Sequence, residues 1–271
     1  MLAFAGVKCL HSRKRLMSFL YETHLHTCEA SKCGRLHGED YIPYMMEKGY
    51  SGIIVTDHFF NGNTCVPSDI SWKERVEIYC SGYERALKAA EGVDFNVMFG
   101  VEFNFNKDEY LLYGVDKKWL LDNESIMEMT RHELFDCVHK AGGIMIQAHP
   151  FRERDYLSDI KLSPETVDGI EVYNAANGAN MNALAFEYCT KLGLPMTSGS
   201  DIHFYHDKEM GGTLFDNRID SVADYVDAIK KRTGTPVSVA PDGTVTPVAH
   251  MREQTVSVEL PTLPVLYPEG K

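Results

Sequence analysis

Two histidines one residue apart, in the segment Glu22-Thr23-His24-Leu25-His26-Thr27, could bind a metal ion. The preceding residues alternate between apolar and polar types as a short strand would. On a strand, residues i and i+2 project from the same face. His24 and His26 are therefore expected to point at one spot, where their imidazole nitrogens can serve as a pair of metal ligands.

Four later segments end in the same residue types. They are Asp57-His58, Glu102, Ala148-His149-Pro150-Phe151-Arg152 and Ser200-Asp201-Ile202-His203. Each follows a short apolar run that predicts a buried strand, and these runs span residues 52–56, 95–101, 144–147 and 194–197. In a β/α barrel the carboxyl ends of the strands meet at one mouth, where active sites are built. We therefore expect these side chains to share a single site.

The predicted set holds five histidines, one glutamate and one aspartate, more ligands than one tetrahedral ion can use. Two or three divalent metal ions are the natural inference, with the Glu102 carboxylate suited to bridging two of them. Imidazole together with carboxylate favours Zn, Fe or Mn over Mg or Ca. Clustered ions of this kind acidify bound water and neutralise phosphate oxygens. The chemistry that they indicate is hydrolysis of a phosphate ester.

Strands that alternate with helices must position these residues. Helical spacing predicts helices at 41–48, 179–192 and 222–231. Capping boxes at Ser71–Glu74 and Ser125–Glu128 predict helices from Trp72 to about Ala90 and from Ser125 to about Gly142. This rhythm implies βα units and a parallel sheet. About seven strands without a break in composition favour a closed or nearly closed barrel.

The chain divides into three expected parts. Residues 18–239 form the barrel domain, residues 1–17 a flexible leader, and residues 240–271 an irregular, proline-rich segment packed on the barrel. Met17 lies just before the first strand and is an alternative start of translation to Met1. We find no signal peptide and no apolar run long enough to span a membrane.

Composition excludes some partners. The 271 residues carry a net charge of −12, which argues against duplex nucleic acid or an anionic membrane as the main partner. A small phosphorylated substrate is compatible with this charge, because a local cluster of positive charge or metal can bind it. The seven cysteines are scattered and lack paired CxxC spacing, which favours a reduced, cytoplasmic setting. Cys28 and Cys33 lie near the two histidines, but we expect neither a metal-ligand role nor a redox role for them.

These motifs resemble those of the PHP (polymerase and histidinol phosphatase) superfamily. The resemblance covers Tyr21–Phe215 and rests on His24-Leu25-His26, Thr56-Asp57-His58, Gly100-Val101-Glu102, Ala148-His149-Pro150 and Gly199-Ser200-Asp201-Ile202-His203. It implies a distorted (β/α)7 barrel with a di- or trinuclear metal site at the C-terminal ends of the strands. It also implies a metal-dependent phosphoesterase.

The resemblance implies a role for each predicted ligand. One ion would be held by His24, His26 and Asp201, and Glu102 would bridge it to a second ion at His149. A third ion would be held by His58 and His203, and Asp201, His203 and His58 would form the catalytic set. The chain departs from the family at Lys32, where trinuclear relatives often carry Asp or His. His37 or Glu29 could substitute there, so the number of ions, two or three, stays open.

Four further residues have predicted roles outside the ligand set. Arg152 is a candidate phosphate clamp, or it forms a surface salt bridge with a nearby acid. Lys32 is a second phosphate-binding candidate, or it is simply solvated. Asn174 binds the substrate, or it caps the helix that follows. Asp57 is expected to orient a ligand histidine.

The leading functional hypothesis is a phosphoesterase that acts on a small phosphomonoester or a nucleotide. One alternative is an amidohydrolase, whose barrels also open with an HxH motif. Another is a non-catalytic, metal-binding regulatory module. Turnover of phosphate esters, turnover of amides, and metal binding without turnover distinguish the three hypotheses.

Overall fold

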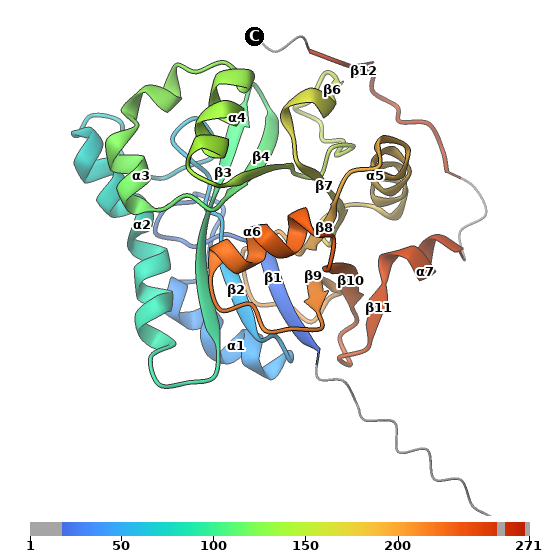
Figure 1. Ribbon diagram of the computed structural model, residues 1–271, viewed down its shortest axis with the longest axis horizontal. Coiled ribbons are helices and arrows are strands. Elements are labelled where there is room, and N and C mark those ends of the chain that lie inside the picture. The colour runs from blue at the N-terminus through green and yellow to red at the C-terminus, as the bar shows by residue number, and fades with distance from the viewer. Residues whose placement is uncertain (1–17, 254–257, 269–271) are drawn as a thin grey trace, which may run out of the picture.

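A curled, mixed β-sheet is the centre of the computed structural model, which describes residues 18–253 and 258–268 (Figure 1). Ten strands follow the order β11-β10-β9-β1-β2-β3-β4-β5-β7-β8. They are β1 (Phe19–Leu25), β2 (Gly52–Val55), β3 (Asn96–Phe105), β4 (Asp108–Tyr113), β5 (Ile144–Gln147), β7 (Gly169–Asn174), β8 (Met196–Gly199), β9 (Met210–Phe215), β10 (Thr235–Val239) and β11 (Val245–Pro247). The predicted leader, residues 1–17, lies outside the described residues.

The sheet curls until its last strand returns to β1. Strands β1, β2 and β3 are parallel, as are β5, β7 and β8. Just past β8, Ile202 forms a parallel bridge with Leu25 of β1. The Thr23 hydroxyl donates to the Ser198 carbonyl at 2.9 Å and ties the same two strands. The predicted α/β class with a barrel-like sheet is confirmed.

Strand β4 departs from the predicted parallel arrangement. It runs antiparallel to both β3 and β5. A two-residue turn joins it to β3, with positive φ at Asn106 (51°) and Lys107 (83°), as tight hairpins require. The expected end of the third strand near Glu102 is therefore wrong, because β3 continues to Phe105. Asn-Lys is a weak hairpin signal beside Asn-Gly, which explains the error.

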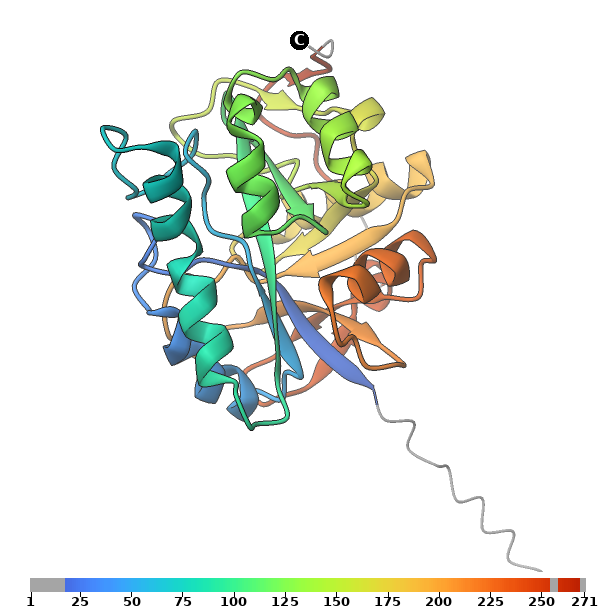
Figure 2. The ribbon, with the colours of Figure 1, turned by 60° about the vertical axis from the view of Figure 1, so that its left-hand side comes forward.

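Helices cover the outside of the curled sheet (Figure 2). They are α1 (Tyr41–Glu47), α2 (Trp72–Ala89), α3 (Lys117–Asp122), α4 (Arg131–Lys140), α5 (Ala179–Leu192), α6 (Val222–Lys230) and α7 (Val248–Glu253). The capping box predicted at Ser71 opens α2 as expected. The box predicted at Ser125 is wrong, because the same spacing recurs at Thr130 and Glu133, which cap α4 instead. Among the described residues, no helix combines the length and apolarity needed to cross a membrane.

The C-terminal segment contains short regular elements. Strand β11 pairs with β10 at the edge of the main sheet, and α7 follows it directly. Strand β12 (Val265–Leu266) pairs with β6 (Ile160–Lys161) in a separate two-stranded sheet. The segment that the sequence predicts to be irregular is thus partly ordered against the main body. The division of the chain into a leader, a barrel domain and a tail stays a prediction.

Candidate metal centre

The predicted ligands lie in or just after strands of the curled sheet. His24 and His26 stand at the end of β1, Glu102 lies within β3, and the others follow β2, β5 and β8 by two to four residues. Two of them adopt strained backbone, with φ of +30° at His149 and +56° at Asp201. Such conformations cost energy and cluster at functional sites.

The Glu102 carboxylate is the first hub of the site. Its Oε1 lies 3.0 Å from His24 Nε2 and 3.3 Å from His149 Nε2. Its Oε2 lies 2.5 Å from His58 Nδ1 and 3.5 Å from His26 Nε2. Glu102 is 1% exposed, so these four imidazoles surround a carboxylate that water does not reach.

The Asp201 carboxylate is the second hub. Its Oδ1 lies 3.1 Å from His26 Nε2, 3.6 Å from His24 Nε2 and 3.7 Å from His203 Nε2. Its Oδ2 accepts a hydrogen bond from Arg152 Nη2 at 2.5 Å. The two hubs share both histidines of the HxH pair. Residues nearly 180 positions apart in the sequence thus converge on one spot.

Hydrogen bonds at Nδ1 orient the rings of His24 and His203. His24 Nδ1 lies 2.9 Å from Glu171 Oε1, and His203 Nδ1 lies 2.7 Å from the Asp201 carbonyl. Both acceptors can only receive a proton, so Nδ1 donates in each ring. In the neutral imidazole, Nε2 then carries the lone pair. In both rings this lone pair faces the carboxylates of the centre.

Asp57 is linked to His26 through Ser31. The Ser31 hydroxyl donates to Asp57 Oδ1 at 2.6 Å, so at 3.2 Å it can only accept from His26 Nδ1. The backbone N–H of His58 donates to the same hydroxyl oxygen. Asp57 thus reaches His26 only through the Ser31 hydroxyl, and its role in orienting a metal ligand stays a prediction.

Among the described residues, four buried side-chain atoms of the centre lack hydrogen-bond partners. His24 Nε2, His26 Nε2, His58 Nδ1 and Glu102 Oε2 are all buried without one, although each lies within 4 Å of an oppositely charged or polar atom of the cluster. A buried polar atom left in this state is costly. A carboxylate oxygen at 3.0 to 3.5 Å stabilises either a proton on the imidazole or a metal cation between the two groups; the carboxylates of Glu171, Asp201 and Glu102 outweigh burial and raise the pKa of His24 well above its usual value. The donor set therefore fits divalent metal ions.

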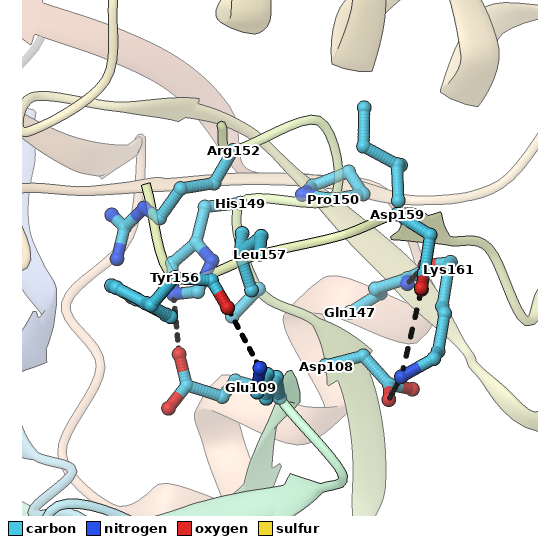
Figure 3. Close-up of a pocket in the computed structure, with 13 residues that line it drawn as sticks. Asp108, Glu109, Gln147, His149, Pro150, Arg152, Tyr156, Leu157, Asp159 and Lys161 are labelled. Atoms are coloured by element: carbon cyan, nitrogen blue, oxygen red, sulfur yellow. Dashed lines mark hydrogen bonds and ion pairs between the residues drawn. The ribbon is translucent and has the colours of Figure 1, made fainter. Parts of the chain in front are cut away.

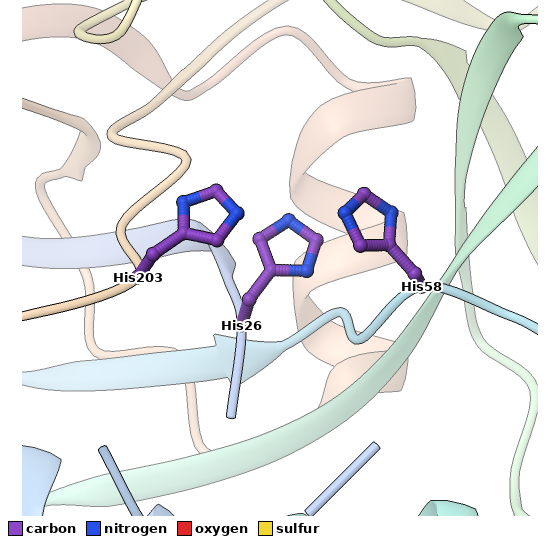
Figure 4. Close-up of side chains that lie close together, drawn as sticks. All are labelled: His26, His58 and His203. Carbon is purple, nitrogen blue, oxygen red and sulfur yellow. The ribbon is translucent and has the colours of Figure 1, made fainter. Parts of the chain in front are cut away.

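The ligand atoms form four overlapping groups whose members lie within 4.8 Å of one another. The groups are His24/His26/Asp201, His24/Glu102/His149, His58/Glu102/Glu109 and His26/His58/His203. Figure 4 shows the last group, in which His26 lies between the other two rings. This geometry brings the predicted ligands together and places Glu109 beside them; their sharing of ions stays a prediction.

The charges of the site keep both hub carboxylates ionised. Burial would raise the pKa of Glu102, but His58 and His24 hold it well below its usual value. Burial would likewise raise the pKa of Asp201, but Arg152 and His24 hold it well below. Both side chains therefore present negative oxygens as ligands at neutral pH.

Three contributors were missed by sequence reasoning. Glu109, at the start of β4, approaches His149 Nε2 at 3.5 Å, and Glu171 contacts His24 from the middle of β7. The thiol of Cys33 contacts the side chains of His203 and His58, and these contacts outweigh burial and lower the thiol's pKa to about 6. The signal for Glu171 was present, since an acid inside an otherwise apolar strand must have a buried partner.

A pocket opens beside His149 (Figure 3). Its lining includes Lys107, Glu109, Arg152 and Tyr156. The pocket thus joins the metal-ligand set to a rim that carries cationic and aromatic side chains.

The three residues predicted to bind substrate lie in different surroundings. Arg152 reaches the centre, where it bonds Asp201, Asn174 Oδ1 at 3.0 Å and Asn177 Oδ1 at 2.9 Å, rather than a surface acid. Asn174 is fully buried, and its amide also donates to Glu171 at 3.0 Å. Lys32 is exposed, and its backbone N–H donates to the Asn63 carbonyl at 2.9 Å. Contact of these residues with substrate stays a prediction.

Comparisons with known proteins agree with this fold. Residues 179–233 match a family model described as PHP-associated, whereas no curated protein matches the chain. A two-domain protein from Bacteroides vulgatus, containing a predicted PHP-like metal-dependent phosphoesterase, is 17% identical at a TM-score of 0.58. That match covers 81% of this chain and 64% of the other.

A second solved structure is a lesion-specific endonuclease from Pyrococcus furiosus. It is 14% identical at a TM-score of 0.50, and the match covers 83% of this chain and 59% of that one. The present chain therefore spans less than two thirds of the length of either protein. At these identities the likeness establishes the fold.

Proposed function

We propose that this chain, a member of the PHP superfamily, hydrolyses a phosphate ester with the help of two or three divalent metal ions. One observation carries the proposal. Three imidazoles have Nδ1 bound to an oxygen, and they direct Nε2 at the ionised carboxylates of Glu102 and Asp201, where a metal cation can replace a ring proton. This is the arrangement of metal-ligating histidines in proteins, whose second nitrogen is held by a neighbour.

The groups of ligand atoms overlap, so neighbouring ions would share residues. His24, His26 and Asp201 would hold one ion, with Glu102 bridging to a second at His149, and with His58 and His203 at a third. Zn, Fe or Mn suits this mixture of imidazole and carboxylate. When bound, such ions activate water and neutralise the negative charge of a phosphate group.

Arg152 is positioned to bind the phosphate. Its Nε and Nη2 are used by Asn177, Asn174 and Asp201, which fix the plane of the guanidinium. Two N–H bonds remain on Nη1, and Arg152 lines the pocket beside His149. A phosphate oxygen in that pocket can accept from them, and Lys32 would add a more distant positive charge.

Asp201, His203 and His58 form the proposed catalytic set. The side chain of His203 is 21% exposed and that of His58 is 11% exposed, whereas those of His24 and His26 are fully buried. Water therefore reaches the centre beside these two histidines, while the pocket beside His149 would take the phosphate. The leaving alcohol would take its proton from water in the same opening.

A small phosphomonoester or a nucleotide is the proposed substrate class. The net charge of −12 opposes a long polynucleotide, which requires a basic face. A lesion-specific endonuclease shares the fold. The experiment must therefore distinguish small substrates from DNA.

The test is a phosphate-release screen of metal-loaded protein. The panel holds p-nitrophenyl phosphate, phosphorylated metabolites, mononucleotides, dinucleotides and damaged duplex DNA, with amides as a separate arm. We expect turnover of small phosphate esters, lost in His24→Ala and Asp201→Ala variants that keep the wild-type circular dichroism. Cleavage confined to amides would support an amidohydrolase, and bound metal without any turnover would support a regulatory module. Either result overturns the proposal.

A further inference from the structure

The loop between β5 and β6 carries residues that line the pocket of the proposed site. Arg152, Tyr156 and Leu157 line this pocket beside His149 (Figure 3). Two turns shape the loop, since the N–H of Arg152 donates to the His149 carbonyl and that of Leu157 to the Arg154 carbonyl. No helix or strand lies between β5 and β6 in this described part of the chain. Contacts with neighbouring segments must therefore hold the loop in place.

The side chain of Glu153 binds the C-terminal segment. Its Oε1 accepts from the backbone N–H of Thr262 at 2.6 Å and from that of Leu263 at 3.4 Å. Its Oε2 accepts from the Thr262 hydroxyl at 2.6 Å. Hydrogen bonds to an ionised carboxylate are stronger than those between neutral groups. Glu153 follows Arg152 directly in the sequence, so this Glu153–Thr262 contact restrains the backbone beside the arginine.

The C-terminal segment is itself fixed on both sides of Thr262. Before it, Asn180 at the start of α5 donates from Nδ2 to the Glu259 carbonyl and accepts at Oδ1 from the Glu259 N–H, both at 2.9 Å. After it, β12 pairs with β6, and the two strands lie side by side in Figure 1. Because β6 directly follows the loop, the C-terminal segment holds the loop at Glu153 and again at its far end.

The metal ligand in this region is held independently of the C-terminal segment. His149 lies at the start of the loop, and its backbone N–H donates to Glu171 Oε2 at 3.0 Å inside the sheet. Loss of the Glu153–Thr262 contact is therefore expected to leave His149 in place. It would act on the part of the loop that carries Arg152.

We propose that Glu153 is a positioning residue for substrate binding, and that it acts by holding the loop that carries Arg152 against the C-terminal segment. The inference rests on the proposed function, in which Arg152 binds the phosphate of the substrate. Arg152 would contact this phosphate in the ground state and in the transition state alike. Removal of such uniform binding raises KM and leaves kcat unchanged. The C-terminal segment thus sets the affinity of the site for its substrate.

Substitutions on both sides of the contact test the proposal. Glu153→Gln removes the charge and keeps the shape of the side chain. Thr262→Val removes only the hydroxyl donor, whereas Thr262→Ser retains it. Glu187→Gln is the matched control, because Glu187 Oε1 accepts from Arg252 Nη2 at 2.9 Å and so binds α7 rather than the loop.

In Glu153→Gln, KM for p-nitrophenyl phosphate should rise about tenfold, which corresponds to weakening one hydrogen bond to a charged group. The inhibition constant of inorganic phosphate should rise equally, while kcat and metal content keep their wild-type values. Thr262→Val should show a smaller rise, because two backbone N–H donors remain, and Thr262→Ser and Glu187→Gln should show none. A wild-type KM in Glu153→Gln, a fall in its kcat or metal content, or an equal rise of KM in Glu187→Gln overturns the proposal.

Two further measurements need no turnover. Amide hydrogen exchange of peptides within residues 150–158 should be faster in Glu153→Gln than in the wild type and unchanged in Glu187→Gln. Calorimetric titration of the metal-loaded proteins with inorganic phosphate should show weaker binding by Glu153→Gln alone. Unchanged exchange and unchanged phosphate binding in Glu153→Gln refute this inference, whether or not the wild type turns over a substrate. If both effects are seen but the wild type hydrolyses no phosphate ester, only the proposed function fails.

Discussion

Asp108 and Glu109 are neighbours on β4, and they enter two different buried charge clusters. Successive strand residues project to opposite faces. Asp108 accepts from Arg131 Nη2 at 2.7 Å and from the Tyr110 hydroxyl at 2.7 Å. Glu109 turns to the metal centre and approaches His58 and His149. Two adjacent carboxylates thus meet buried surroundings of very different charge.

The difference lies in where the positive charge comes from. The Asp108–Arg131 pair, with side chains 6% and 4% exposed, is balanced within the chain, and Arg131 also lies 5.0 Å from the centre of the Phe105 ring. Among the described residues, the metal centre gathers four carboxylates around its imidazoles and the guanidinium of Arg152. The first cluster is an internal ion pair that stabilises the fold, whereas the second has the ligand groups that suit divalent cations.

Glu102→Gln should have the largest effect, because it removes the charged hub and keeps the shape of the side chain. A loss of several kcal/mol of transition-state stabilisation corresponds to about a thousandfold lower kcat/KM. Metal content per chain, measured by plasma emission, should fall together with activity. Full activity with unchanged metal content would mean that Glu102 is no ligand.

Arg131→Met should have the opposite profile. It removes the closest cation of the buried Asp108 carboxylate and leaves only the longer contact with Lys161 Nζ at 3.9 Å, and breaking a buried pair typically costs about 3–5 kcal/mol of unfolding free energy. Urea denaturation should reveal this loss, while kcat of the metal-loaded enzyme stays near that of the wild type. Adding Asp108→Asn should restore much of the stability. A variant that keeps its stability but loses turnover would mean that Arg131 supports the metal centre and not the stability of the fold.

Metal itself should stabilise only one of the two clusters. At about one hundred times its dissociation constant, an ion that binds only the folded state adds about 2.7 kcal/mol of stability. Thermal unfolding should show this gain in the wild type and in Arg131→Met, since the two clusters are independent, but not in Glu102→Gln. An equal gain in all three proteins would place the stabilising ion elsewhere.

Glu171→Gln should have the smallest effect of the series. It weakens the acceptor that holds His24 Nδ1, and changes of this type cost about 10- to 100-fold in metal affinity. Titration with Zn²⁺ against a competing chelator measures the shift. The protein should regain activity at higher metal concentration, which Glu102→Gln should not. Failure to recover would mean that Glu171 does more than orient the ring.

Much of the site follows from local patterns. His24 and His26 are recognisable because a two-residue spacing on a strand places two side chains on one face. His58, His149 and Asp201 are recognisable because short apolar runs predict the strands that they follow. The helices at Ala179–Leu192 and Val222–Lys230 follow equally from local spacing and capping.

Other contributors could not be found in this way. The reversal of β4 depends on a weak two-residue turn at Asn106 and Lys107, and it alone brings Glu109 to the centre. Glu171 is visible as an acid in an apolar strand, but its partner, His24, is 147 positions away. Cys33 lies in a loop whose position is set by hydrogen bonds to Asn63 and His203.

The sequence by itself determined which side chains end the strands and what chemistry those types allow, because side-chain periodicity is a local property of the backbone. Only the tertiary structure decided which imidazoles face the Glu102 and Asp201 carboxylates, which ring nitrogens are hydrogen-bonded, and that Glu109 and Glu171 join them. Those features depend on strand register and loop contacts between distant residues, and packing of the whole sheet sets both.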